Sequence, residues 1–135
     1  MPTPPLPDDL RRLLEKPNPA VIATVRPDGQ PVSVATWYLL DGDRILVSMD
    51  ATRKRLQHLR RDPRVALTAL DKDNWETHVS VVGHVAEMVD DEDLSDIDRL
   101  SRRYRGRPYP DRTSPRVSAW IDIERYHGWG AARTS

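Results

Sequence analysis

The segment Val47–Arg55 carries the residues in this sequence whose types and spacing best suit chemistry. It reads Val-Ser-Met-Asp-Ala-Thr-Arg-Lys-Arg, so hydroxyls and three cations stand where a β-prone run gives way to a helix-prone one. A helix N-terminus presents unpaired N–H groups and positive potential, which suit a phosphate. Arg53 and Arg55 would add charge-assisted hydrogen bonds. The segment is therefore a candidate phosphate site.

Two other interpretations of this segment stay open. The cations could form a solvated face that only keeps the helix soluble. Asp50 could also cap the helix with its own carboxylate, and its charge would then repel an anion.

Several standard catalytic machineries are missing from the sequence. The six glycines form neither a G-x-G-x-x-G fingerprint nor a phosphate loop, and no G-x-S-x-G elbow is present. There is no cysteine, which excludes disulfides, thiolate catalysis and iron–sulfur clusters. His78 and His84 share one strand face, but six residues of strand separate them by roughly 20 Å. We therefore expect no metal site.

The composition fits one domain over residues 1–135. Lys plus Arg and Asp plus Glu both number 21, so no global charge steers the protein to nucleic acid or membrane. The cluster from Arg53 to Arg61 also has little aromatic interleaving, which argues against nucleic-acid binding. The N-terminus lacks a signal-peptide pattern and no apolar run reaches membrane length, so we expect a cytoplasmic protein.

The elements that must position the basic segment are short strands with a few helices. After an extended arm over residues 1–7, Asp8 or Asp9 is expected to cap a helix that ends before Pro17. Short β-prone runs predict strands over 20–25 and 64–70, and apolar residues on one face predict strands over 32–40, 45–49, 77–89 and 117–123. Helical spacing predicts helices over 50–61 and 90–105.

These elements predict a mainly β (α+β) fold, a six-stranded antiparallel split β-barrel with peripheral helices. Turn residues follow 20–25 and 32–40, so the first fifty residues are expected to form a three-stranded meander. Gly83 in the middle of the long strand predicts a bulge or a barrel bend. No strand–helix–strand alternation is sustained, which excludes a doubly wound fold.

The order of these segments resembles the pyridoxamine 5′-phosphate oxidase-like superfamily of split β-barrels. The resemblance covers nearly the whole chain and is densest over residues 20–70. Within the superfamily, cations before a helix and then Leu-Arg-Arg-Asp-Pro-Arg-Val at 59–65 are similar to the branch that uses the deazaflavin coenzyme F420. The segments that carry the resemblance are 20–25, 28–32, 37–38, 41–45, 53–65, 83–85 and 103–105.

The resemblance implies a homodimer with cofactor at the subunit interface, and an oxidoreductase that passes a hydride between F420 and an unsaturated or quinone-like small molecule. It implies phosphate contacts from Arg53, Lys54 and Arg55. The ring would lie along Ala35, Thr36, Trp37, Ser48 and Met49. By chain position, candidates from the second protomer are Trp75, His78, Tyr109 and Trp129. Tyr109 and His78 are also candidates for a proton donor.

Two alternatives to an F420-dependent enzyme remain. FMN needs the same basic phosphate site and would make the chain an oxidase or reductase. A split barrel can also bind flavin, haem or F420 without catalysing a reaction.

Overall fold

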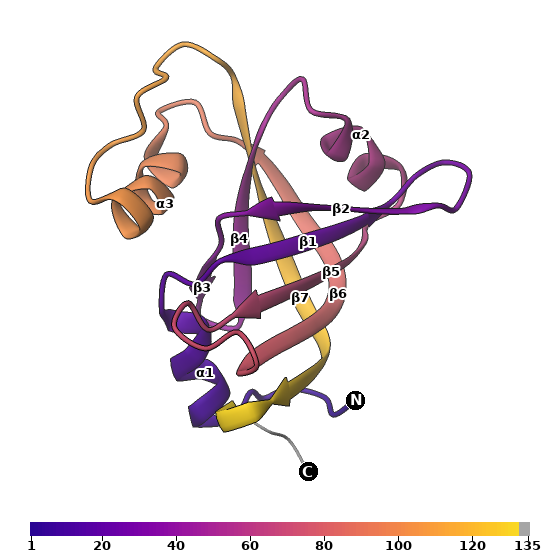
Figure 1. Ribbon diagram of the computed structural model, residues 1–135. Helices are drawn as coiled ribbons and strands as arrows, with labels where there is room; N and C mark the ends of the chain where they lie inside the picture. The colour runs from indigo at the N-terminus through magenta and orange to yellow at the C-terminus, as the bar shows by residue number, and fades with distance from the viewer. Residues whose placement is uncertain (133–135) are drawn as a thin grey trace.

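The computed structural model describes residues 1–132, which form three α-helices, seven strands and a final 3₁₀ turn (Figure 1). The elements are α1 (Asp8–Glu15), β1 (Ala20–Val25), β2 (Pro31–Thr36), β3 (Leu39–Asp41), β4 (Arg44–Asp50), α2 (Lys54–Arg61), β5 (Arg64–Leu70), β6 (His78–Asp90), α3 (Ser95–Arg105), β7 (Arg116–Trp129) and η1 (Gly130–Ala132). This composition confirms the mainly β, α+β class.

The strands form one antiparallel sheet in the order β2-β1-β5-β6-β7-β4-β3. The expectation of six strands was wrong, because the run from Val32 to Leu40 divides into β2 and β3 at opposite edges. Within residues 1–132 no ladder joins these two edges, so the barrel is open rather than closed. The expected meander is replaced by two separate hairpins, β1–β2 and β3–β4.

The break between β2 and β3 has a packing cause at Tyr38. Its side chain is fully buried, and its hydroxyl donates to the carbonyl of Lys16 at 3.2 Å. Burial raises the pKa of the Tyr38 hydroxyl, so it stays a neutral donor. Because the chain turns inward to bury this ring, it leaves one edge of the sheet at Thr36 and joins the other at Leu39. In Figure 1, β1 and β2 accordingly run at a steep angle to β4 and β7.

One main core fills the space inside the curved sheet. It combines inward residues of β1, β4, β5, β6 and β7 with the apolar faces of α1 and α2. The two helices contribute Leu10, Leu13, Leu14, Leu56 and Leu59. A second, smaller cluster of Leu46, Ile97 and Leu100 packs α3 against the other side of β4. The helices therefore attach to the sheet through apolar contacts at the spacing that the sequence predicts.

Three helix starts differ from expectation. Helix α2 begins at Lys54 instead of Asp50, because Asp50 still belongs to β4 and pairs with Arg116. Pro7, rather than Asp8 or Asp9, is the N-cap of α1. Both aspartates lie in the first turn, where their negative charges interact favourably with the positive end of the helix dipole. Helix α3 begins at Ser95 instead of Asp90, because Asp90 still pairs with Val117 in the sheet. The acids before α3 do serve the helix. The carboxylate of Asp91 accepts hydrogen bonds from the N–H groups of Asp96 and Ile97 at 3.2 and 2.9 Å.

Gly83 sits at the expected irregularity, where the β6–β7 register shifts. A Cβ at this position would lie 1.9 Å from the carbonyl oxygen of Asp122, which is backbone and has little freedom to move. We expect Gly83→Ala to lower the free energy of unfolding by about 2–4 kcal/mol. Urea denaturation checks this, with Ala86→Ser at an exposed site of β6 as the control, expected within about 0.5 kcal/mol. If both variants changed the free energy of unfolding equally, the close approach of Gly83 to the backbone of Asp122 would be contradicted.

Candidate functional site

Two adjoining cavities of about 790 and 750 Å³ form one groove between β1–β2, the end of β4 and the connector that follows α3. They share five lining residues, which are Ala35, Ser48, Tyr109, Asp111 and Arg116. We call the larger one, lined by the α2 cations Arg53, Lys54 and Arg55, the cationic compartment. The smaller one, which contains Trp37 and Tyr104, is the aromatic compartment.

The turn from β4 into α2 leaves the start of this helix without a side-chain cap. The carboxylate of Asp50 accepts hydrogen bonds from the N–H and the hydroxyl of Thr52, at 2.8 and 2.7 Å. Asp50 therefore closes its own turn and does not cap α2. The N-cap is Arg53, which makes no capping hydrogen bond, and the first turn holds no acid. The positive end of this helix is free to meet an anion.

Positive charge converges in the cationic compartment, and the three α2 cations there have no ion-pair partner in the described part of the chain. Within residues 1–132, Arg53, Lys54 and Arg55 form no ion pair and no side-chain hydrogen bond. The Nε of Arg55 is buried with no hydrogen-bond partner. Burial, with help from Arg53 and Arg116, lowers the pKa of the Arg55 guanidinium. A half-buried cation beside two like charges is costly, and a bound anion would relieve that cost.

Two carboxylates, Asp50 and Asp111, also line this compartment, and Asp50 lies beside the start of α2. Hydrogen bonds from Thr52, followed by the charges of Arg116 and Arg53, lower the pKa of Asp50. Asp50 is thus ionised and reduces the positive charge by one. His58 also lines the compartment, and its Nδ1 lies 3.4 Å from the hydroxyl of Thr24.

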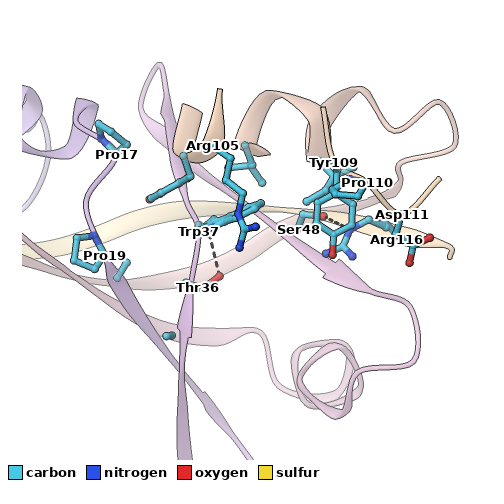
Figure 2. A pocket seen from close by; sticks show the side chains of 15 residues that line it. Pro17, Pro19, Thr36, Trp37, Ser48, Arg105, Tyr109, Pro110, Asp111 and Arg116 are labelled. Carbon is cyan, nitrogen blue, oxygen red and sulfur yellow. Dashed lines mark hydrogen bonds between the residues drawn. The ribbon is translucent and has the colours of Figure 1, made fainter. Parts of the chain in front are cut away.

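The aromatic compartment is built around the bend between β2 and β3 (Figure 2). The rings of Trp37 and Tyr104 are nearly parallel with centroids 5.4 Å apart, and Tyr109 meets Trp37 edge-on at 6.2 Å. The hydroxyl of Tyr104 donates to the carbonyl of Asn18 at 2.7 Å, and burial raises its pKa. Prolines and aliphatic residues complete the wall, namely Pro17, Pro19, Pro110, Ile97 and Leu100.

An ion pair holds the connector that brings Tyr109 to the groove. The guanidinium of Arg112 donates to the carboxylate of Asp98 at 2.7 and 3.1 Å. The same carboxylate accepts a hydrogen bond from the N–H of Tyr109 at 2.9 Å. Arg112 is the main cause that lowers the pKa of Asp98. The backbone of Tyr109 is therefore fixed to α3, and Asp111 follows it into the shared wall.

Arg116 stands at the junction of the two compartments. Its Nε donates to the hydroxyl of Ser48 at 3.0 Å, and its guanidinium lies 4.9 Å from the centroid of the Tyr109 ring. Sequence reasoning missed Arg116, as it missed Arg105, Asp111 and His58. The signal for Arg116 is the pairing of β7 with β4, which places it opposite Asp50.

Most of the residues proposed from the sequence meet at this groove. Those that line it are Ala35, Thr36, Trp37, Ser48, Met49, Arg53, Lys54, Arg55 and Tyr109. Met49 is fully buried in the core, so it contributes only to the floor.

Three candidates, Trp75, His78 and Trp129, do not line the groove of their own chain. Trp75 is 69% exposed in the loop between β5 and β6. His78 begins β6 and pairs with Trp129.

Within residues 1–132, no group of three or more His, Asp or Glu side chains could hold a metal ion, and no helix is long and apolar enough to cross a membrane.

Comparisons with known proteins bear on the family and the fold of this chain. The family model described as pyridoxamine 5′-phosphate oxidase matches residues 6–130. A solved structure named F420 reductase is 30% identical with a TM-score of 0.81, and the match covers 90% of this chain and 98% of that chain. The conserved hypothetical protein Rv2991 from Mycobacterium tuberculosis is 28% identical with a TM-score of 0.72, over 94% of this chain and 86% of that one.

General Stress Protein 26 from Bacillus anthracis str. Sterne, 18% identical, shares the fold at a TM-score of 0.69, over 90% of this chain and 92% of that one. A search of curated proteins gives no significant match. Because the family model spans nearly all of the described residues, this chain belongs to the pyridoxamine 5′-phosphate oxidase family.

Proposed function

We propose that the groove binds coenzyme F420 and that the chain is an F420-dependent oxidoreductase acting on an unsaturated or quinone-like small molecule. The observation that carries the proposal is the set of three cations at the start of α2 that have no ion-pair partner within residues 1–132, with the buried, unpartnered Nε of Arg55 among them. They adjoin a compartment lined by aromatic rings. The similarity to an F420 reductase supports the deazaflavin over other phosphorylated rings.

The residues present suit such a cofactor. Arg53 and Arg55, with the free N–H groups of α2, would hold its phosphate, and Lys54 would add charge. The ring would lie at the wall that the two compartments share, along Ala35 and Ser48 and the backbone of Thr36 and Trp37, and would leave the Trp37 ring facing the aromatic compartment. When bound, F420 supplies the hydride, which the protein itself cannot provide.

The chain's own contribution is to bind, orient and exclude water. Tyr109 and Pro110 form an apolar wall, fixed by the Asp98–Arg112 pair. The hydroxyl of Tyr104 is committed to Asn18 and has a raised pKa, so it is a poor proton source. The hydroxyl of Tyr109 makes no hydrogen bond within residues 1–132. It remains the candidate group in this chain's groove that could pass a proton to the substrate.

Titration of the purified protein with F420 and with FMN, followed by cofactor absorbance and fluorescence, tests the proposal. We expect F420 to bind at least about tenfold more tightly than FMN, and reduced F420 to be oxidised by menadione in the presence of the protein. Tighter binding of FMN would favour the flavin alternative. If F420 bound tightly but no quinone were turned over, the chain would be a cofactor-binding protein without catalysis, and the enzymatic assignment would be contradicted.

We also propose that the active form is a homodimer that uses the outward face of the sheet. The face consists of small or weakly polar side chains outside both core clusters, namely Val21, Ala23, Ala66, Thr68, Ser80 and Val82. It adjoins the groove through Ala35, which pairs with Val21 and lines both compartments. A second copy on this face would bring its own residues to the groove. Trp75, His78 and Trp129 remain candidates for that contribution.

A charge on this face should separate the dimer. Thr68 forms a hydrogen bond with Ser80 at 2.7 Å in the middle of the face. We expect Thr68→Arg to convert dimer to monomer in sedimentation analysis and to weaken F420 binding at least about tenfold, since a desolvated, unpaired charge costs several kcal/mol. Glu92→Arg, in the turn before α3, should leave both properties unchanged. A Thr68→Arg protein that stays dimeric would rule out this face.

A further inference from the structure

Arg105 is the last residue of α3, and its charge has no ion-pair partner within residues 1–132. Within residues 1–132 its guanidinium forms no ion pair and no hydrogen bond, and its recorded contact is with the Trp37 ring at 5.4 Å. Two neighbouring arginines of α3 have polar partners: Arg99 pairs with Asp41, and Arg103 donates to backbone carbonyls. Arg105 instead lines the aromatic compartment, and Figure 2 shows its side chain extending past Trp37.

The shape and chemistry of the aromatic compartment favour a flat molecule. The stacked rings of Trp37 and Tyr104 and the edge-on ring of Tyr109 line a cavity of about 750 Å³, and three prolines add rigid apolar surface. Planar conjugated ligands gain most from such walls, because aromatic faces and edges both offer contacts.

The charges that line the compartment favour an anion. Arg105 and Arg116 supply two positive charges, and Asp111 supplies one negative charge. One oxygen of Asp111 accepts hydrogen bonds from the N–H groups of Thr113 and Ser114 at 3.0 Å. Hydrogen bonds from the side chain and the N–H of Ser114, followed by that from Thr113, hold the pKa of the Asp111 carboxyl far below its usual range, so the group is ionised. One positive charge is left uncompensated, and Arg105 is the cation here without a polar partner.

We propose that the aromatic compartment binds the hydride acceptor, and that this acceptor is a planar conjugated molecule with a carboxylate that pairs with Arg105. The inference rests on the proposed function, and it assigns the cofactor's phosphate to one compartment and the acceptor to the other. In the reaction, an electron-poor double bond of the acceptor gains a hydride from the reduced cofactor and a proton that the Tyr109 hydroxyl passes on from solvent. The acceptor is reduced by two electrons and the cofactor is oxidised by two.

Calorimetric titration with two flat probes tests the assignment without turnover. 2-Naphthoate carries the carboxylate, and 2-naphthamide is its neutral counterpart of nearly the same shape. We expect the naphthoate to bind about fivefold to twentyfold more tightly to the wild-type protein, the range for a partly exposed charge-assisted contact. Arg105→Gln should remove this preference, and Arg105→Lys should retain part of it. Arg102→Gln, one turn away and outside the groove, should leave it unchanged.

The same titrations with F420 present separate this inference from the proposed function. Saturating F420 should leave the naphthoate affinity within about twofold of its value in the free protein, because the two ligands occupy different compartments. Competition between them would overturn the assignment of this compartment to the acceptor. So would equal binding of the two probes, or a preference that survives Arg105→Gln. A protein that prefers naphthoate but fails to bind F420 would refute the proposed function while leaving an anion-selective aromatic site.

Discussion

Arg55→Met is expected to change cofactor affinity and protein stability in opposite directions. F420 should bind about tenfold to a hundredfold more weakly, which corresponds to the 1.5–3 kcal/mol typical of a hydrogen bond to a charged group. The free energy of unfolding of the cofactor-free protein should rise by about 1 kcal/mol. The methionine removes a donor that is buried without a partner and relieves repulsion from Arg53 and Arg116.

Cofactor titration and urea denaturation of the same preparations measure the two effects. Arg60 is an exposed cation of the same helix outside the groove, so Arg60→Met is the matched control. We expect Arg60→Met to change affinity less than about twofold and stability by less than about 0.5 kcal/mol. Arg53→Ala should weaken binding over a similar range to Arg55→Met. If both the Arg53 and the Arg55 variant bound F420 with unchanged affinity, the phosphate would not bind at this site.

Arg103→Met is expected to lower the free energy of unfolding by about 2–4 kcal/mol. The guanidinium of Arg103 joins α3 to two other parts of the chain. It donates to the carbonyl of Tyr38 at 3.0 Å and to those of Leu14 and Glu15 at 3.0 and 2.5 Å, and it also donates to Lys16. Loss of this side chain would leave the last carbonyls of α1 and the bend at Tyr38 without their shared donor.

Urea denaturation checks this prediction, with Arg102→Met as a control expected within about 0.5 kcal/mol of the wild type. Arg103→Lys should recover no more than about half of the loss, because an ammonium cannot reach several carbonyls in the fork geometry of a guanidinium. Because Tyr38 follows Trp37 directly, Arg103→Met should also weaken naphthoate binding in the aromatic compartment. If Arg103→Met and Arg102→Met were equally stable, Arg103 would not hold these elements together.

Local patterns in the sequence were enough to place several elements. β-Prone runs predicted β1 and β5 with the bounds that the structure gives, and the apolar pair Leu56 and Leu59 predicted α2, although its start at Asp50 was four residues early. The break at Tyr38 was not predictable in this way. The run from Val32 to Leu40 alternates like a single strand, and only the burial of Tyr38 against α1 and α3 divides it. Tertiary packing there overrides the local pattern.

The part of the candidate site whose residues are neighbours in the sequence was predictable. Arg53, Lys54 and Arg55 follow one another, so a single segment revealed them. Arg105 and Arg116 reach the groove only through the docking of α3 and the pairing of β7 with β4, which no local pattern contains. Trp75 and His78 were chosen by chain position alone, and the geometry of one chain does not bring them to its own groove.

A crystal structure of the protein with bound F420 tests the central claim most directly. We predict that the phosphate lies within hydrogen-bonding distance of the Arg55 guanidinium and of the first N–H groups of α2, with Arg53 beside it. A phosphate bound outside the cationic compartment, or displaced from it by the carboxylate of Asp50, would contradict the account.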